Sequence, residues 1–353
     1  MEKVRFGILG CGFIGRLHIE KILTQEDAEV IAVFDPNESL AKQAAKMSGG
    51  QVISTAEELI NLNEVDAVLV ASPNKTHADL AIKVLEAGKH LISEKPLALS
   101  GKEAKKIAAA AEKAGVTTMI PHQMRWAGSS KKIKELSDKG EMGNIYYAKA
   151  GWLRQSGIPG WGSWFTRFDE SGGGPLIDIG VHMLDLSLFL MGNPKPVSVY
   201  GSTYAEFGPR KMGCGAWGTP DWDGSYDVED LASALIKMDN GATLALEVSW
   251  AANVSTEASK ANVVLLGTEG GASVVPGGNE LKLTGMKFGQ SFSCDANVPD
   301  LDMREEMIRH FLDCVKAGKQ TIAPVFSGMV NNIILDAIYE SAKTGKSVDI
   351  NWE

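Results

Sequence analysis

The chain has 353 residues, of which 44% are hydrophobic and 22% are charged, and its formal net charge is -9. This length favours two domains, and the composition is that of an ordinary globular protein. A negative net charge gives no electrostatic reason to bind nucleic acid or an acidic membrane surface, so a small-molecule role is expected. The four cysteines form no CxxC pair, which argues against a zinc site and favours a reduced, cytoplasmic environment.

The N-terminal segment lacks the pattern of a signal peptide, and no uninterrupted apolar run reaches the ~18 residues of a membrane span, so we expect no membrane partner. Residues 3–9 form a short apolar run typical of a buried strand. A GxGxxG pattern follows, formed by Gly10, Gly12 and Gly15, and then a helical stretch. In this context the glycines predict a tight turn that brings backbone close to a pyrophosphate at a helix N-terminus. A second match, at 213–218, has neither a strand before it nor a helix after it and is predicted to be a loop.

Asp35 ends the next apolar run, 20 residues after Gly15. An acid at this position accepts hydrogen bonds from the ribose hydroxyls of NAD and repels the 2′-phosphate of NADP, so NAD is favoured. Pro36 and Asn37 add no compensating positive charge. As an alternative, Asp35 caps the helix that begins near Asn37.

Strand and helix patterns alternate up to about residue 123, which predicts a doubly wound parallel sheet. Ligands bind beyond the carboxyl ends of such strands. Ser72 and Asn74 follow one strand, and Glu94 and Lys95 follow the next. A lysine there can donate to a substrate hydroxyl or relay its proton, although a surface lysine before a turn proline has the same pattern.

After this point, short runs of alternating apolar and polar residues are separated by turn signals, which predicts a mostly antiparallel sheet. We therefore predict a dinucleotide-binding Rossmann domain over residues 1–123 and a substrate-binding and oligomerisation domain over residues 124–353. The two C-terminal helices, at about 302–317 and 326–344, are expected to pack back across the boundary. Residues 208–224 are predicted to form a long loop near the sheet.

The stretch 172–185, GGGPLIDIGVHMLD, leads from a glycine run into a helix that is apolar almost all round. Asp178, His182 and Asp185 follow one another at i, i+4 and i+7 and so share one polar stripe. Because buried polar groups need partners, this stripe lines either an internal hydrogen-bond network or a wet cavity. Only the cavity would give it a catalytic role.

Taken together, the motifs of this chain resemble those of the glucose-fructose oxidoreductase, inositol dehydrogenase and rhizopine catabolism family (Gfo/Idh/MocA). The motifs are GCGFIG, Asp35, SPN with His77, EKP at 94–96, Arg125 and the 172–185 stretch. The motifs occur in the family's order over most of the chain. The resemblance implies an α/β fold, with an N-terminal Rossmann doubly wound parallel sheet and a C-terminal α+β domain. In that domain an open-faced, mainly antiparallel sheet packs against the catalytic helix.

The resemblance also implies roles for individual residues. Lys95 corresponds to the family's catalytic lysine, and Asp178 and His182 to the acid and the general base of its D-x-x-x-H pair. Family members usually form dimers or tetramers through the open sheet, so a homo-oligomer is expected. The implied cofactor contacts are Gly10, Gly12, Phe13, Ile14, Gly15, Asp35, Ser72, Asn74, His77, Glu94, Lys95 and Arg125.

The function predicted is an NAD-dependent oxidoreductase that transfers a hydride between nicotinamide and a secondary alcohol of a sugar, glycoside or cyclic polyol, without a metal. His182 is the candidate base, because the ordinary imidazole pKa of about 6.5 suits reversible proton transfer. Asp178 holds the substrate or orients the ring. Lys95 polarises the same oxygen from the other domain, which requires the two domains to form one cleft.

Further substrate contacts are predicted in the sequence before and after the helix. Aromatic faces bind the C–H faces of pyranoses and cyclitols, although tryptophans are as often core residues. The predicted substrate-binding residues are Lys95, Arg154, Trp161, Trp164, Arg167, Asp178, His182 and Asp227, with Trp152, Trp217 and Trp222 as weaker candidates.

Two rival functions stay open at this stage. One is an NAD-retaining glycosidase that oxidises a sugar transiently at C3 and releases the aglycone by elimination. The other is a catalytically inactive NAD-binding sugar sensor. The presence of Lys95, Asp178 and His182 argues against the sensor.

Overall fold

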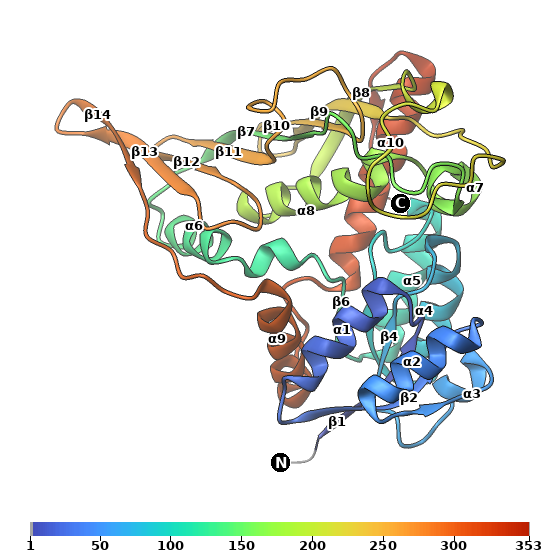
Figure 1. The fold of residues 1–353 in the computed structure, drawn as a ribbon. Helices are drawn as coiled ribbons and strands as arrows, with labels where there is room; N and C mark the ends of the chain where they lie inside the picture. Colours follow the sequence, from blue (N-terminus) through green and yellow to red (C-terminus); the bar gives the residue numbers. More distant parts are fainter. Residues whose placement is uncertain (1–2, 353) are drawn as a thin grey trace. The chain divides into compact units, whose positions relative to one another are not determined.

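The structure, a computed structural model, describes residues 3–352, which form two compact units (Figure 1). Unit 1 consists of the residues up to Pro121 together with Arg304–Asn332, and unit 2 consists of His122–Met303 together with the residues from Ile333 onward. Unit 1 contains a parallel sheet and unit 2 a mainly antiparallel one, so the predicted α/β fold class is confirmed.

The sheet of unit 1 has six parallel strands in the order β3-β2-β1-β4-β5-β6. Every residue of β4 is buried, as expected for a central parallel strand covered on both faces by helices. The strand order reverses direction between β1 and β4, which creates the switch point where this fold binds ligands. The strands are β1 (Val4–Leu9), β2 (Ala28–Phe34), β3 (Gln51–Val52), β4 (Ala67–Val70), β5 (His90–Ser93) and β6 (Thr118–Met119).

The helices of unit 1 begin and end at residues suited to those positions. The side chains of Asn37, Thr55 and Ser100 accept backbone N–H groups at the starts of α2, α3 and α5. Gly49 and Gly115 end α2 and α5 in the left-handed conformation. The helices are α1 (Phe13–Leu23), α2 (Glu38–Ser48), α3 (Ala56–Ile60), α4 (His77–Glu86), α5 (Gly101–Ala114), α9 (Met303–Ala317) and the first part of α10 (Val325–Thr344).

Unit 2 is built on a nine-stranded sheet in the order β14-β13-β12-β11-β7-β10-β9-β8-β15. Neighbouring strands are antiparallel except β7 and β10, which run parallel. The helix α8 (Val181–Leu190) packs on β7 and β10, and α6 (Gly128–Asp138) packs near β12. The strands are β7 (Ile145–Leu153), β8 (Pro196–Tyr204), β9 (Leu231–Met238), β10 (Thr243–Ser249), β11 (Asn262–Gly267), β12 (Gly270–Val274), β13 (Leu281–Lys287), β14 (Gln290–Asp295) and β15 (Val348–Asp349).

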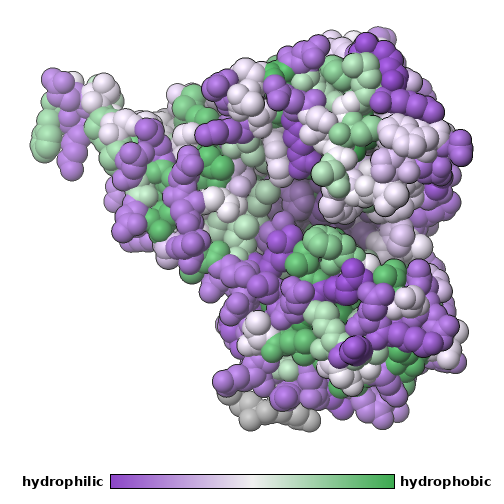
Figure 2. Space-filling model, in the orientation of Figure 1, coloured by the Kyte–Doolittle hydropathy of each residue, from purple (hydrophilic) through white to green (hydrophobic). Residues whose placement is uncertain are grey.

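Several short or exposed elements, namely β3, α3, β14 and β15, are not predicted from the sequence. All six residues of β14 are exposed, so no apolar alternation marks it. Together β13 and β14 form a hairpin whose outer end carries the exposed side chains of Met286 and Phe288, and Figure 2 shows apolar surface there. The second glycine match, residues 213–218, lies in a loop, as predicted.

One helical stretch of the described residues, 168–190, is long and apolar enough by composition to cross a membrane. Most of it is buried inside unit 2. Burial of this kind is typical of the core helix of a globular domain.

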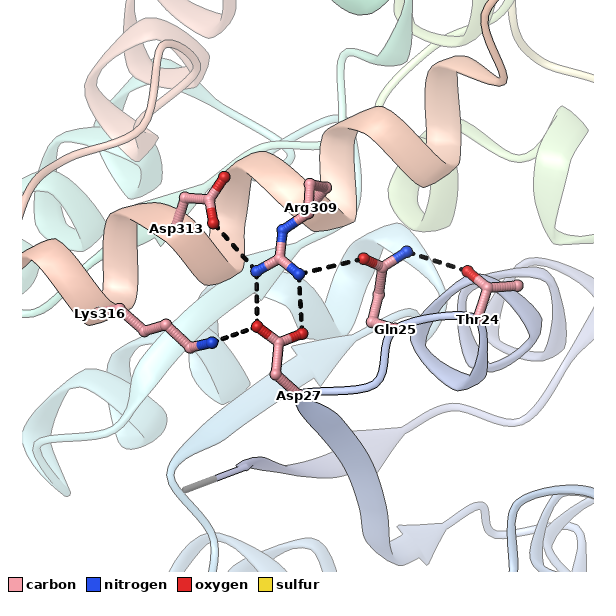
Figure 3. A network of polar contacts seen from close by, with 6 residues as sticks. All are labelled: Thr24, Gln25, Asp27, Arg309, Asp313 and Lys316. Atoms are coloured by element: carbon pink, nitrogen blue, oxygen red, sulfur yellow. Dashed lines mark hydrogen bonds and ion pairs between the residues drawn. The ribbon is translucent and has the colours of Figure 1, made fainter. Parts of the chain in front are cut away.

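The helix α9 completes the core of unit 1, although nearly two hundred residues separate it from β6 in the sequence. The ring of Phe311 packs against Phe6 of β1 at a centroid distance of 6.0 Å, and both side chains are fully buried. At the surface, Asp27 accepts two hydrogen bonds of 2.8 Å from Arg309 and pairs with Lys316 (Figure 3). These contacts fix α9 against the turn between α1 and β2.

Candidate active site

Four neighbouring strands of unit 1 end at the same level. Leu9 pairs with both Phe34 and Val70, and Val70 pairs with Ser93. The residues that follow these strands therefore line one edge of the sheet, in the order Asp35, Gly10, Ser72 and Glu94 with Lys95. The sequence prediction that these residues gather at the carboxyl edge agrees with this arrangement.

The glycine turn between β1 and α1 has no room for a side chain at Gly10 or Gly15. Gly10 has φ +97, and a Cβ there would lie 2.5 Å from the carbonyl oxygen of Ala71. A Cβ on Gly15 would lie 2.0 Å from the Gly10 carbonyl oxygen. These contacts require glycine at both positions.

The start of α1 has the features of an anion site. Among the side chains of residues 3–352, none caps its N-terminus, and its first turn contains no acidic residue. Apart from Gly12 itself, the residues next to it in the chain and the backbone of the helix, no heavy atom of the described residues lies within 4 Å of a Cβ built on Gly12. Its first N–H groups and the positive end of the helix dipole can therefore receive a pyrophosphate, so the chain fits the predicted dinucleotide.

Asp35 links the end of β2 to the glycine turn. Its Oδ2 accepts the backbone N–H of Cys11 at 2.8 Å, and its Oδ1 accepts that of Asn37 at 2.8 Å. The helix α2 is capped by the side chain of Asn37. The alternative role of Asp35 as the cap of this helix is therefore wrong.

His77 and Ser72 hold the backbone of the neighbouring strand ends. The ring of His77 is 1% exposed, with Nδ1 2.7 Å from the Pro96 carbonyl oxygen and Nε2 2.8 Å from that of Ser72. Burial lowers the pKa of His77, and the two carbonyl contacts oppose this. The structure shows His77 in contact with the backbone, and its predicted contact with the cofactor stays a prediction. Asn74 is also buried, at 8% exposure.

Glu94 and Lys95 follow β5. The carboxylate of Glu94 contacts Nε2 of His18 at 2.7 Å through Oε1 and accepts the backbone N–H of Lys95 at 3.0 Å through Oε2. Burial alone would raise the pKa of Glu94, but the hydrogen bond and charge of His18, with the charge of Lys95, lower it to about 2. Sequence reasoning missed His18, which lies 76 residues from Glu94.

The helix predicted to carry the catalytic pair begins with a π-helical turn, Leu176–Gly180, before α8. Its polar residues divide into two groups. Asp178 and His182 are partly exposed, whereas Asp185 is 1% exposed. The Oδ2 of Asp178 accepts the indole N–H of the fully buried Trp250 at 3.0 Å. Asp178 is thus held in place by Trp250 while it stays partly exposed.

Asp185 belongs to an internal network. It receives two hydrogen bonds from Arg125, at 2.7 Å and 2.5 Å, and lies 3.5 Å from Nε2 of His122. The ring of His122 packs edge-on against that of His182. Arg125 is 2% exposed and stacks over Phe189, so it has a packing and charge-pairing role in the structure. Its predicted cofactor contact stays a prediction.

The glycine run before this helix is fixed by Glu229. Its buried carboxylate accepts the N–H groups of Gly174 and Leu176 and the hydroxyl of Tyr339, each at 3.0 Å. Burial raises the pKa of Glu229, and these hydrogen bonds act in the opposite direction. A Cβ on Gly174 would lie 2.0 Å from the Glu229 carbonyl oxygen. The backbone at the start of the helix is therefore closely packed against Glu229.

The loops 154–171 and 208–227 interlock through backbone hydrogen bonds, such as Asp221 N–H to Trp161 O. Trp161 is 4% exposed, because its ring stacks with Trp222 at 5.5 Å and Tyr226 at 6.2 Å. The stacking of a sugar on Trp161 stays a prediction, and in this structure Trp222 and Tyr226 cover the indole. Trp164 is partly exposed beside Phe165, and the most exposed indoles are those of the weaker candidates, Trp217 at 46% and Trp222 at 49%.

The polar residues predicted to contact the substrate have different partners in the structure. Arg167 pairs with Glu170 at 3.0 Å, and the carboxylate of Asp227 accepts the N–H of Phe168 at 2.6 Å, so both support the loop. Arg154 lies over the ring of Trp152, and its burial lowers its pKa, opposed by the charge of Asp178. Because the charge of Asp178 acts on Arg154, Arg154 stays a predicted substrate contact. Among residues 3–352, no three His, Cys, Asp or Glu side chains are grouped as metal ligands.

The chain matches models of known protein families. Residues 4–122 match the model described as "Oxidoreductase family, NAD-binding Rossmann fold", and residues 130–273 match that of the "GFO/IDH/MocA C-terminal domain". The chain is 34% identical to D-glucoside 3-dehydrogenase of Escherichia coli (strain K12), over 98% of this chain and 97% of that protein. It is 27% identical to scyllo-inositol 2-dehydrogenase (NAD(+)) of Bacillus subtilis (strain 168), over 99% and 97%.

A solved levoglucosan dehydrogenase, in complex with NADH and levoglucosan, has the same fold. Its TM-score is 0.88 at 23% identity, with 99% of this chain and 100% of that chain covered.

Proposed function

Because this chain belongs to the Gfo/Idh/MocA oxidoreductase family, we propose that it oxidises a secondary alcohol of a sugar, glycoside or cyclic polyol with NAD. One observation carries the proposal: the uncapped start of α1, Asp35 and Lys95 follow neighbouring strands at one edge of the parallel sheet. Relatives named as glucoside and inositol dehydrogenases support the substrate class. When bound, NAD supplies the hydride acceptor.

Each of the three proposed catalytic residues has a separate task. The alcohol loses a hydride from carbon and a proton from oxygen, and His182 takes that proton. Lys95 donates a hydrogen bond to the same oxygen and stabilises its developing negative charge. Asp178, held by the indole of Trp250, accepts a neighbouring hydroxyl and so orients the substrate.

The alcohol substrate is tested by measuring NADH formation with a panel of inositols, free sugars and simple glycosides. We expect turnover with at least one member of the panel, and losses of roughly a thousandfold in kcat for Lys95→Ala and His182→Ala. Lys113→Ala, which removes an exposed lysine at the end of α5, serves as the control and should turn over normally. The proposal would be contradicted if no member of the panel gave NADH while aldehydes or amino compounds were turned over. Aglycone release without NADH would favour the glycosidase.

The preference for NAD rests on Asp35. Its carboxylate stands at the end of β2 where a ribose would lie, and residues 36 and 37 are uncharged. The wild-type ratio of kcat/KM for NAD over NADP should be large, and Asp35→Ser should lower it by roughly tenfold or more. A wild-type protein that prefers NADP would refute this assignment.

We further propose a cytoplasmic homodimer or homotetramer that associates through the open face of the nine-stranded sheet. Leu235 and Tyr200 pair across β9 and β8 and are 52% and 51% exposed. Light scattering should give the mass of two or four chains, and Leu235→Glu should reduce it to that of one. A wild-type protein with the mass of one chain would exclude this association.

A further inference from the structure

A buried carboxyl group of unit 2 holds the start of the helix that carries Asp178. Glu229, which lies two residues before β9, is 6% exposed. Its Oε2 accepts the N–H of Gly174 and its Oε1 accepts that of Leu176, each at 3.0 Å. Its Oε1 also accepts the hydroxyl of Tyr339, on α10, at 3.0 Å. All of these residues belong to unit 2.

The two backbone contacts satisfy the donors at the start of the helix. Pro175 lies between Gly174 and Leu176 and has no N–H, so Glu229 accepts both backbone donors of residues 174–176. The first N–H groups of a helix find no acceptor within the helix, and buried ones need an acceptor from elsewhere. Residues 174–176 are buried, which gives the two contacts with Glu229 their importance.

One further hydrogen bond connects these contacts to Asp178. The carbonyl oxygen of Gly174 accepts the N–H of Asp178 at 3.1 Å. Gly174 is therefore held by Glu229 at its N–H and bonded to Asp178 at its carbonyl. The surroundings are closely packed, because a Cβ built on Gly173 would lie 1.9 Å from the hydroxyl oxygen of Tyr339.

The turn that contains Asp178 is π-helical, over Leu176–Gly180. Such turns are rare and occur mostly as single turns within α-helices, frequently at functional sites. A π-helical turn contains more residues than an α-helical turn, so the residue at which it begins determines the side of the helix that later side chains face. In this structure the carboxylate of Asp178 faces Trp250 and accepts its indole N–H at 3.0 Å.

We propose that Glu229 is a positioning residue for Asp178: by accepting the N–H groups of Gly174 and Leu176, it fixes where the π-helical turn begins and thus where the Asp178 carboxylate lies. The consequence for turnover rests on the proposed function, in which Asp178 orients the substrate. The placement of Asp178 does not depend on that function and is measured without a substrate.

The first test follows the indole N–H of Trp250 by NMR, because its hydrogen bond reports the position of the Asp178 carboxylate. The chain has eight tryptophans, and the signal that is lost in Trp250→Phe identifies the resonance in protein made with isotope-labelled tryptophan. We expect the resonance to shift in Glu229→Gln, because the amide has one acceptor oxygen and leaves one of the two backbone N–H groups facing an NH₂ group. Asp178→Asn, which changes the acceptor itself, gives the reference shift.

Ser341 provides a matched control on α10. It is fully buried in unit 2, and its hydroxyl oxygen accepts the N–H of Gly201 at 2.9 Å. Ser341→Ala thus removes another buried acceptor of a backbone N–H, and it should leave the Trp250 resonance at its wild-type position. If Glu229→Gln does not fold, Glu229→Asp takes its place, because its side chain is one methylene shorter and too short to keep both N–H contacts.

Kinetics provide the second test. With an active substrate, Glu229→Gln should lower kcat by roughly tenfold, because a displaced Asp178 orients the substrate poorly. The KM for NAD should stay within about twofold of the wild type, and Ser341→Ala should change neither quantity by more than about twofold. In an Asp178→Asn background, Glu229→Gln should lower kcat no further, since its effect acts through Asp178.

Three results would overturn the role of Glu229. They are a Trp250 resonance at its wild-type position in Glu229→Gln, an equal shift of that resonance in Ser341→Ala, and a wild-type kcat in Glu229→Gln. If no alcohol is oxidised by the wild type, the proposed function fails, while the Trp250 resonance still decides whether Glu229 places Asp178.

Discussion

Asp27→Asn should loosen α9 from unit 1 in a manner that depends on pH. The carboxylate of Asp27 is 12% exposed and receives two hydrogen bonds from Arg309, with Lys316 as a second cation. Charge-assisted hydrogen bonds contribute about 1.5–3 kcal/mol each, whereas exposed ion pairs contribute about 0–1 kcal/mol. Because Arg309 is 37% exposed, solvent screens the pair. We therefore expect Asp27→Asn to lower the free energy of opening α9 by about 2–3 kcal/mol in total.

The pH dependence follows from the pKa of Asp27. The hydrogen bond from Arg309 outweighs burial and, with Lys316, holds this pKa well below its ordinary value of about 3.9. The folded state therefore binds fewer protons than the unfolded state at low pH. The stabilisation is present above about pH 4 and is lost by up to ~1.4 kcal/mol per pH unit below it, until the folded carboxyl protonates.

Hydrogen exchange of the α9 amides measures this directly, because it reports the local opening free energy of one helix. The wild type and Asp27→Asn should differ by about 2–3 kcal/mol at about pH 7, and this difference should be smaller by about 1–1.4 kcal/mol at about pH 3. Asp313→Asn is the matched control: it removes a contact of 3.0 Å with the same Arg309, but Asp313 is 65% exposed, so we expect less than about 0.5 kcal/mol. An equal difference at both pH values would show that packing, not charge, holds α9.

Three further predictions follow from burial. Gly174→Ala should lower the free energy of unfolding by about 1–3 kcal/mol and lower kcat, because its Cβ would lie 2.0 Å from a backbone oxygen. Denaturation experiments and steady-state rates measure these two effects. Trp161→Ala should cost about 3–5 kcal/mol by the same denaturation assay, whereas Trp217→Ala should cost less than about 1 kcal/mol and change mainly the substrate KM. Burial raises the pKa of Cys11 to about 12, so Ellman's reagent should modify the exposed Cys294 and leave Cys11 unmodified in the folded protein at about pH 8.

The strand-end residues could be predicted because their positions depend on local patterns. An apolar run places its last residue at the sheet edge, so Asp35 and Lys95 follow from the sequence alone. Asp185 could not be assigned in this way. Its helical spacing matches that of Asp178 and His182, and only the contact with Arg125, 60 residues away, takes it into the core.

The loops and the long-range pairs could not be predicted for a related reason. Trp161 becomes buried because a second loop brings Trp222 and Tyr226 against it, and no period in the sequence encodes that meeting. The contact of His18 with Glu94 likewise joins a side chain of α1 to the residue that follows β5, 76 positions later in the sequence. A histidine in the second turn of a helix that follows a glycine turn is a weak signal, and it gains meaning only once its carboxylate partner is known.

The packing of Phe311 against Phe6 has a consequence for biosynthesis. A ribosome makes β1 first and the complementary face of α9 only after the whole of residues 122–303 has been translated. During that interval the nascent Rossmann unit exposes the apolar surface that α9 will cover, which makes it a candidate client for chaperones. A truncated gene ending at residue 121 should accordingly yield an aggregation-prone product, and fusing residues 304–332 to it through a linker should improve its solubility.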